Sequence, residues 1–190
     1  DWGNAWKKHF TRLVISPQLI ISPPWEAQPG DIVIEPGMAF GSGDHPTTRA
    51  CLDSIVRHAR PGQRCLDVGC GSGILALAAA RLGMVAAGID IDEDAIRVAK
   101  ENAEQNGLNA TFSTTPLALV DGMADLVVAN VYAEVLVDLA PDLARRCRRR
   151  IALAGILATK ADGVIAAFPG FTVSRRQQDG EWVSLELERP

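Results

Sequence analysis

The chain has little of what marks metal sites, disulfide frameworks and membrane proteins. Its four cysteines (Cys51, Cys65, Cys70 and Cys147) form no C-x-x-C pair, and its three histidines are scattered. This spacing does not suit zinc, so we expect no metal and four reduced, mostly buried thiols, as in a cytoplasmic protein. No apolar run approaches the roughly 20 residues that cross a bilayer, and the opening DWGNAWKKHF lacks a signal-peptide stretch. We therefore expect no membrane association.

Length, composition and net charge indicate which class of protein this is. A chain of 190 residues fits one domain. Hydrophobic residues make up 47% and charged residues 22%, as in soluble globular proteins. The net charge of -4 gives no global attraction to nucleic acid, so direct nucleic-acid binding is not expected. The first residue is not a methionine, and we expect the chain to be a piece of a longer protein.

The hydrophobic pattern predicts an irregular start and a regular α/β remainder. Two short strands broken at Ser16-Pro17 and a third at Ile32 to Glu35 precede a helix that begins near Pro46. Strands are expected at 64–68, 85–89, 110–113, 124–129, 151–158, 171–176 and 182–188, and helices at 73–82, 93–106, 132–148 and 161–167. This alternation predicts a doubly wound, mainly parallel seven-stranded sheet that ends in an antiparallel hairpin. Residues 1–45 form an N-terminal extension packed on a main domain, residues 46–190.

The stretch LDVGCGSG (66–73) predicts a loop that holds a nucleotide-like cofactor. A strand runs directly into Gly69, Gly71 and Gly73, and a helix follows. Glycines permit a tight turn and close approach to a ligand, and the helix start offers free N–H groups. Asp90 ends the next strand, where a carboxylate accepts hydrogen bonds from both ribose hydroxyls. The alternative is that these glycines only tighten a β-α turn.

Two cofactors fit such a loop. Gly71 to Ala76 matches G-x-G-x-x-A, the fingerprint of dinucleotide-binding proteins, which would indicate an NAD-linked oxidoreductase. However, Asp67 stands two residues before Gly69, where its charge would repel a pyrophosphate. A carboxylate suits the cationic S-adenosyl-L-methionine better. The run D-x-G-x-G-x-G, with Asp90 about twenty residues on, resembles the first motif of class I methyltransferases.

The strand ADLVVAN ends at Asn130, a candidate catalytic residue. Ligands of doubly wound sheets lie beyond the carboxyl ends of the strands, which puts Asn130 at the mouth of the site, near the methyl group to be transferred. Val131-Tyr132 follows, which is not the N-P-P-Y signature of enzymes that methylate adenine or glutamine amides. Asn130 as the N-cap of the next helix is an alternative that does not exclude the first.

A second glycine-rich stretch, EPGMAFGSGDHPTT (35–48), precedes the first helix. Together with LDVGCGSGILALAAARLG, GIDIDEDAI, ENAEQNG and ADLVVAN, it closely resembles the ribosomal protein L11 methyltransferases. The likeness continues through ISPPW, AGILATKAD and GEWVSLEL, and so spans nearly the whole chain. That bacterial family trimethylates amino groups on a protein of the large ribosomal subunit. The resemblance implies an S-adenosylmethionine-dependent N-methyltransferase with a ribosomal protein as its partner.

The resemblance also implies roles for individual residues. Contacts to S-adenosylmethionine are implied for Thr48, Gly69, Asp90 and Asn130. The glycine loop adds Asp67 and Gly71 as expected cofactor-binding residues. A flexible lid over the cofactor is implied for Gly41, Gly43 and His45, although His45 as a plain surface histidine is an equal alternative. Asn130 is the best acceptor for the substrate amine. Asp44, His45 and Glu134 are candidate proton acceptors, but none has a spacing that identifies a general base.

Two departures from the family bear on the substrate. Where the family usually has N-[IV]-L-A-x-x-L, this chain places Tyr132 and Glu134, which we expect to alter the acceptor pocket. Family members also carry a separate N-terminal substrate-recognition domain, and this chain begins about where its linker would end. Either that domain is missing here, or the chain is a stand-alone relative with another protein or small-molecule acceptor. A non-catalytic cofactor-binding subunit is a further, less favoured alternative.

The basic run RRCRRR (145–150) allows two interpretations. Five arginines would suit contact with ribosomal RNA. We favour instead cations at a helix C-terminus, where they complement the helix dipole and form a solvated face.

Overall fold

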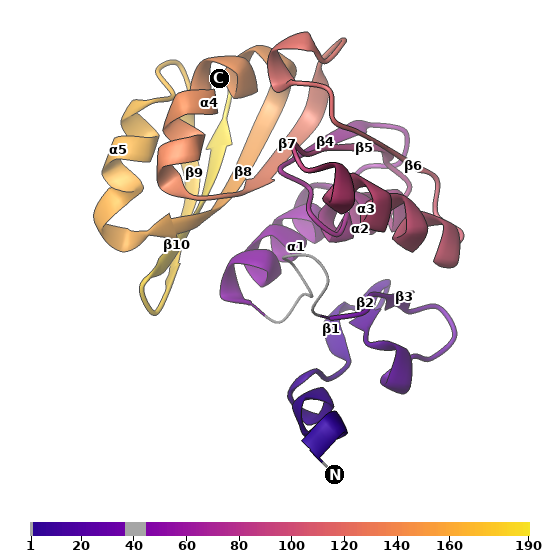
Figure 1. The fold of residues 1–190 in the computed structure, drawn as a ribbon. Coiled ribbons are helices and arrows are strands. Elements are labelled where there is room, and N and C mark those ends of the chain that lie inside the picture. Colours follow the sequence, from indigo (N-terminus) through magenta and orange to yellow (C-terminus); the bar gives the residue numbers. More distant parts are fainter. Residues whose placement is uncertain (1, 37–44) are drawn as a thin grey trace.

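The protein is an α/β structure built on one seven-stranded sheet and a smaller three-stranded sheet. It is known from a computed structural model that describes residues 2–36 and 45–190. The large sheet has the order β6-β5-β4-β7-β8-β10-β9, parallel from β6 to β8 and antiparallel at β10 and β9. The predicted doubly wound sheet with a C-terminal hairpin is confirmed (Figure 1).

The elements follow the predicted alternation closely. The strands of the large sheet are β4 (Arg64–Val68), β5 (Val85–Ile89), β6 (Ala110–Ser113), β7 (Ala124–Asn130), β8 (Cys147–Leu157), β9 (Thr172–Asp179) and β10 (Trp182–Glu188). The helices are α1 (Pro46–His58), α2 (Ile74–Arg81), α3 (Glu93–Gln105), α4 (Ala133–Arg146) and α5 (Ala161–Ala166). No described helix is long and apolar enough to span a membrane.

The two faces of the sheet are covered by different helices because strand residues point alternately to either side. Cys65, Leu126 and Val128 pack with α1, α2 and α3 on one face. Leu66 and Val127 pack with α4 and α5 on the other, as Figure 1 shows. All four cysteines are buried and unbridged, as expected, and burial raises the pKa of each thiol, to about 11 for Cys147.

The opening segment forms the three-stranded sheet β1 (Leu13–Ser16), β2 (Leu19–Ser22) and β3 (Ile32–Val33), preceded by a 3-10 helix at Trp2–His9. Arg12 donates two hydrogen bonds to Asp31, at 2.7 and 2.8 Å, and these hold the pKa of Asp31 well below its usual range. Asn106, which caps the end of α3, bonds the backbone N–H and C=O of Val33. The small sheet is thereby attached to the α3 side of the large one.

The prediction of one helix over 132–148 is wrong at its end. Helix α4 stops at Arg146, and Cys147 begins strand β8. Cys147 and Ile151 are buried in the sheet while Arg148 and Arg149 face solvent. The arginines of the run hide this strand, whose register with β7 also shifts here. The cations at 148–150 therefore lie on β8 and not at a helix terminus.

Most arginines of the basic run have intramolecular partners. In the last turn of α4, Arg145 pairs with Asp142, and Arg146 donates to the carbonyl oxygen of Ala118 at 2.7 Å. Arg150 donates to His58 Nδ1 at 2.8 Å and to Glu188 at 2.7 Å. Arg150 therefore links β8 to α1 and β10, whereas Arg145, Arg148 and Arg149 are exposed, and Arg145 and Arg146 lie in the last turn of α4 as the favoured interpretation expects.

A buried carboxylate joins this arginine network to α1. Glu186 of β10 is 6% exposed and accepts hydrogen bonds from Arg57 and, at 2.7 Å, from His58 Nε2. Burial alone would raise the pKa of Glu186, but these two donors hold it below its usual value. The carboxylate is thus ionised at neutral pH and links α1 to the antiparallel end of the sheet.

We expect Glu186→Gln to lower the free energy of unfolding by about 2 kcal/mol at pH 7, because it leaves the partly exposed Arg57 without its counter-charge and weakens the acceptor of His58 Nε2. The matched control is Glu188→Gln, two residues along the same strand, whose half-exposed pair with Arg150 contributes less than about 1 kcal/mol. Urea unfolding of the three proteins measures both values. Equal losses in the two variants would contradict a special role for Glu186.

Candidate functional site

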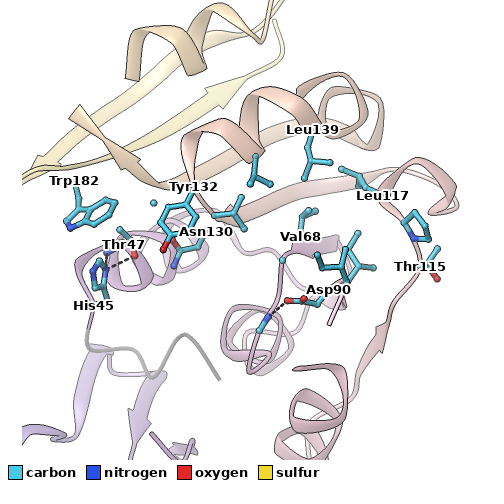
Figure 2. A pocket seen from close by; sticks show the side chains of 18 residues that line it. His45, Thr47, Val68, Asp90, Thr115, Leu117, Asn130, Tyr132, Leu139 and Trp182 are labelled. Atoms are coloured by element: carbon cyan, nitrogen blue, oxygen red, sulfur yellow. Dashed lines mark hydrogen bonds between the residues drawn. The ribbon is translucent and has the colours of Figure 1, made fainter. Parts of the chain in front are cut away.

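A cavity of about 620 Å³ opens at the carboxyl ends of the central parallel strands (Figure 2). From β4 the sheet continues to β5 and β6 on one side and to β7 and β8 on the other. The loops that follow β4 and β7 therefore run in opposite directions and leave a crevice between them. The wall includes backbone and side chains from the glycine loop, the ends of β5 and β7, and the start of α4. Its size is that of a small-molecule cofactor site.

The glycine loop closes tightly against the neighbouring strands. The backbone N–H groups of Gly69 and Cys70 donate to the carbonyl oxygen of Ile89 at 2.8 and 2.9 Å. Gly69 has a φ of 72°, and a Cβ atom there would lie 2.6 Å from Val131 Cγ1. Only glycine fits this position, because both the positive φ and the close approach exclude a side chain.

Asp90 is fixed by the same loop. Its Oδ2 accepts from Gly71 N at 2.9 Å, and its Oδ1 accepts from Asp92 N at 3.0 Å. Figure 2 shows the Asp90 side chain at the cavity wall beside the loop. Each carboxylate oxygen can accept a second bond, so the orientation of Asp90 is set in advance for a ligand with two neighbouring hydroxyls.

Asp67 lies beneath the loop. Its side chain is 1% exposed, and its Oδ2 accepts from Ala76 N at 3.2 Å, in the first turn of α2. Its Oδ1 has no hydrogen-bond partner in the part of the chain that the structure describes. Burial raises the pKa of Asp67 to about 7, and the nearby charge of Asp90 adds to this rise. The predicted cofactor contact of Asp67 therefore stays a prediction, whereas its support of the loop is seen directly.

Asn130 lies where β7 enters the cavity. Its Nδ2 donates to Thr48 Oγ1 at 3.2 Å, which joins β7 to the first turn of α1. Its Oδ1 is buried and has no hydrogen-bond partner among the described residues. The alternative role as a helix cap is wrong, because Tyr132 occupies the N-cap of α4. A buried amide oxygen without a donor is costly, and a ligand N–H would satisfy it.

Gly155 of β8 was missed by the sequence analysis. Its φ is 83°, and a Cβ atom there would lie 2.6 Å from the carbonyl oxygen of Val131 and 3.2 Å from Asn130 Oδ1. The pairing of β8 with β10 shifts register here, which identifies a β-bulge. The missing side chain at Gly155 leaves room for the Val131 carbonyl oxygen and Asn130 Oδ1 at this end of the cavity. Nothing in the stretch AGILATKAD indicates this role.

His45 and Thr47 form the wall nearest α1. His45 is the N-cap of α1, where its Nδ1 accepts from Thr47 N at 3.3 Å and lies 2.7 Å from Thr47 Oγ1. Its ring meets Trp182 edge to face, with 5.3 Å between centroids. The predicted lid residues Gly41 and Gly43, and Asp44, lie outside the described residues.

The structure thus brings Gly69, Gly71, Asp90, Asn130 and His45 to one cavity, with Thr48 and Asp67 directly behind its wall. Several further residues line the cavity that were not predicted from the sequence: Ile91, Thr115, Leu117, Val135, Leu139 and Trp182. The carboxyl end of each parallel strand is a signal that could have found Thr115, which follows β6. The others come from loops, helix α4 and the hairpin, whose approach to the cavity depends on tertiary packing.

We expect Asp67→Asn to stabilise the protein increasingly as pH rises. The pKa of Asp67 is about 7 in the folded state and near 4 in the unfolded state. Between pH 4 and pH 7 the folded state keeps a proton that the unfolded state has lost, so the natural protein becomes less stable as the pH rises through this range. Relative to the variant, the natural protein should lose about 2–3 kcal/mol between pH 5 and pH 8. Urea unfolding at the two pH values measures this. A pH-independent difference would contradict the raised pKa.

Known proteins resemble the chain over its whole length. The family model described as Ribosomal protein L11 methyltransferase (PrmA) matches residues 1–190. Ribosomal protein L11 methyltransferase of Geobacter sulfurreducens is 47% identical over 97% of this chain and 65% of its own length. That of Thermus thermophilus is 42% identical over all of this chain and 78% of its own length. The chain spans only 64–65% of the first three relatives.

Solved structures agree with the fold. The crystal structure of ribosomal protein L11 methylase from Lactobacillus delbrueckii subsp. bulgaricus superposes with a TM-score of 0.86 at 34% identity, over 95% of this chain and 99% of that chain. Magnesium protoporphyrin IX methyltransferase from Synechocystis, solved with bound SAM, has a TM-score of 0.61 at 24% identity over 73% of this chain and 76% of that chain, and supports the fold alone. The match over residues 1–190 and the identities above 40% show that this chain belongs to the ribosomal protein L11 methyltransferase (PrmA) family.

Proposed function

We propose that the chain is the catalytic part of an S-adenosylmethionine-dependent N-methyltransferase that methylates amino groups of ribosomal protein L11. The main support is the buried Oδ1 of Asn130, which has no hydrogen-bond partner among the described residues. It lies at one end of a cavity whose other part holds Asp90 and the glycine loop. Membership of the family supports both the reaction and the partner. A cytoplasmic location is part of this proposal, because a ribosomal protein is the proposed substrate.

The residues present fit S-adenosylmethionine. Asp90 would accept from the two ribose hydroxyls, and Gly69 and Gly71 leave room for the ligand to approach the loop backbone. Ile91 and Leu117 supply apolar surface beyond Asp90, suited to the adenine ring. The carboxylate of Asp67 lies beneath the loop, where a ligand cation would favour its charged form. The lid role of Gly43 and His45 belongs to the same proposal.

The cofactor supplies an electrophilic methyl group on a sulfonium, so the protein mainly has to orient and desolvate the amine. A lysine is only about 0.1% neutral near pH 7.4, a penalty of roughly 4 kcal/mol. Asn130 Oδ1 offsets part of it by accepting an N–H of the neutral amine and directing its lone pair along the cavity. Thr48 holds the amide of Asn130 in this orientation, and Gly155 allows the Val131 carbonyl to assist. We assign no general base.

Residues 1–45 and 46–190 are proposed as an extension with lid and a catalytic domain, respectively. The extension has its own three-stranded sheet, and the cavity belongs to the large one. The part of the relatives that this chain does not span is the proposed source of much of the substrate recognition. Tyr132 and Glu134, which differ from the usual family pattern, leave a related acceptor as the second candidate.

We expect Asp90→Ala to weaken S-adenosylmethionine binding about 10- to 100-fold, because two hydrogen bonds to the ribose are lost. Thr48→Ala should weaken binding less, since it acts by loosening Asn130. Calorimetric titration measures both, with Asp94→Ala, an 88% exposed carboxylate four residues along the chain and outside the cavity lining, as the control. Unchanged affinity in Asp90→Ala would remove the basis for the cofactor assignment.

Methyl transfer tests the whole proposal. Labelled S-adenosylmethionine is incubated with undermethylated ribosomal protein L11 and the chain, and with any longer product that its gene encodes. We expect label on amino groups, and much less label with Asp90→Ala at the same low cofactor concentration. If the cofactor binds but L11 stays unlabelled with every form, the ribosomal substrate is wrong and another acceptor must be sought.

A further inference from the structure

A smaller hollow of about 190 Å³ adjoins the cavity at its Asn130 end. Thr47 and Trp182 line both spaces, so the two spaces meet at these side chains. Figure 2 shows Thr47 and Trp182 near Asn130, whereas Asp90 lies at the opposite end of the cavity. The smaller hollow is therefore next to the place where the acceptor amine is proposed to bind, and away from the ribose end of the cofactor site.

This hollow lies between α1 and the β9–β10 hairpin, and we call it the side hollow. Helix α1 contributes residues at the i, i+3, i+4 and i+7 positions of one helix face: Pro46, Arg49, Ala50 and Asp53. The hairpin contributes two cross-strand pairs on one face of its strands: Gln177–Ser184 and Asp179–Trp182. The side chains of Ala50 and Ser184 are small, which leaves space between the two faces.

The charged side chains of the side hollow have no partners among the described residues. Arg49, Asp53 and Asp179 make no side-chain hydrogen bond or ion pair there, although Arg49 and Asp53 are four residues apart on one helix. By contrast, Arg176, on the same strand as Asp179, pairs with Asp162 at 2.9 Å. The described lining thus carries two carboxylates and one guanidinium, an excess of one negative charge.

Such a lining suits an extended polypeptide segment. The backbone N–H groups of a segment can donate to the two carboxylates, and its carbonyl oxygens can accept from Arg49. The excess negative charge favours basic side chains, because charge complementarity across a surface selects partners and speeds their encounter. An amine that belongs to a protein reaches Asn130 only together with the residues on either side of it. Those residues must lie beside the cavity, where the side hollow is.

We propose that the side hollow binds the residues that flank the acceptor amine, and that Asp53 and Asp179 select a basic residue among them. This inference rests on the proposed methyltransferase function. It gives this chain a share of substrate recognition that does not depend on the part of the relatives that it leaves unspanned. The reacting atoms lie on the other side of Thr47 and Trp182, so the side hollow governs acceptor binding and not the chemical step.

Steady-state methylation of ribosomal protein L11 is the first test. The double variant Asp53→Asn, Asp179→Asn keeps the size of both side chains, and Asn-Gly suits the hairpin turn as well as Asp-Gly does. We expect the KM for L11 to rise about three- to tenfold, with kcat and the affinity for S-adenosylmethionine unchanged. Added salt should raise the KM of the natural chain more than that of the double variant, because salt screens the charges.

The matched control is the double variant Glu104→Gln, Glu181→Gln. It removes the same charge at two exposed positions outside the side hollow, one of them in the hairpin turn. We expect its KM for L11 to match that of the natural chain. An equal rise of KM in both double variants would mean that net charge alone acts, and would overturn the side hollow as a recognition site. An unchanged KM in the aspartate variant would overturn it too.

Peptide binding tests the side hollow without turnover. Two blocked nonapeptides with one central lysine, flanked by arginines or by serines, are titrated calorimetrically in the presence of S-adenosylhomocysteine. We expect the arginine-flanked peptide to bind the natural chain about three- to tenfold more tightly, and this preference to disappear in Asp53→Asn, Asp179→Asn. The same preference in both proteins, or none in the natural chain, overturns the proposal even if L11 is methylated. A preference that requires the two carboxylates, with no methylation of L11, would keep the side hollow and reject the ribosomal substrate instead.

Discussion

The site depends on the absence of a side chain at Gly69. The loop between β4 and α2 bonds to the end of β5 through Ile89, and Val131 after β7 occupies the space that a Cβ atom of residue 69 would need. Three strand ends therefore meet in one place. Gly71 then fixes Asp90, and the chain beyond β7 leads from Asn130 into α4. Any larger residue at 69 would separate these groups.

Buried polar groups near the two ends of α1 differ in what they bond to. At its C-terminal end, Arg57 and His58 satisfy the buried Glu186, and Arg150 extends the network to Glu188. At its N-terminal end, Asn130 Oδ1 and, farther in, Asp67 Oδ1 are left without described partners. Ser54 Oγ and the Nε atoms of Arg57 and Arg150 also lack partners among the described residues, but they lie away from the cavity. The two oxygens of Asn130 and Asp67 are the unpartnered atoms that a ligand in the cavity could reach.

The sequence predicted the order of the elements and the glycine loop with Asp90, because local periodicity and turn chemistry determine both. It also indicated Asn130 and Thr48, but only the structure shows that they bond to each other. The strand at 147–150 was hidden because three arginines interrupt the apolar alternation of β8. Gly155 and Trp182 could not be placed, since their proximity to Asn130 arises from the antiparallel pairing of distant segments.

Strand β9 ends the sheet with eight exposed residues, TVSRRQQD. An open edge offers unpaired N–H and C=O groups to any other extended chain, and a long, flat, apolar edge invites aggregation. Here a second copy laid antiparallel in the register centred on Arg175 and Arg176 would bring these arginines opposite their equivalents in the other copy. Like charges facing each other across strands are unfavourable, so the composition of the last hairpin keeps the sheet finite.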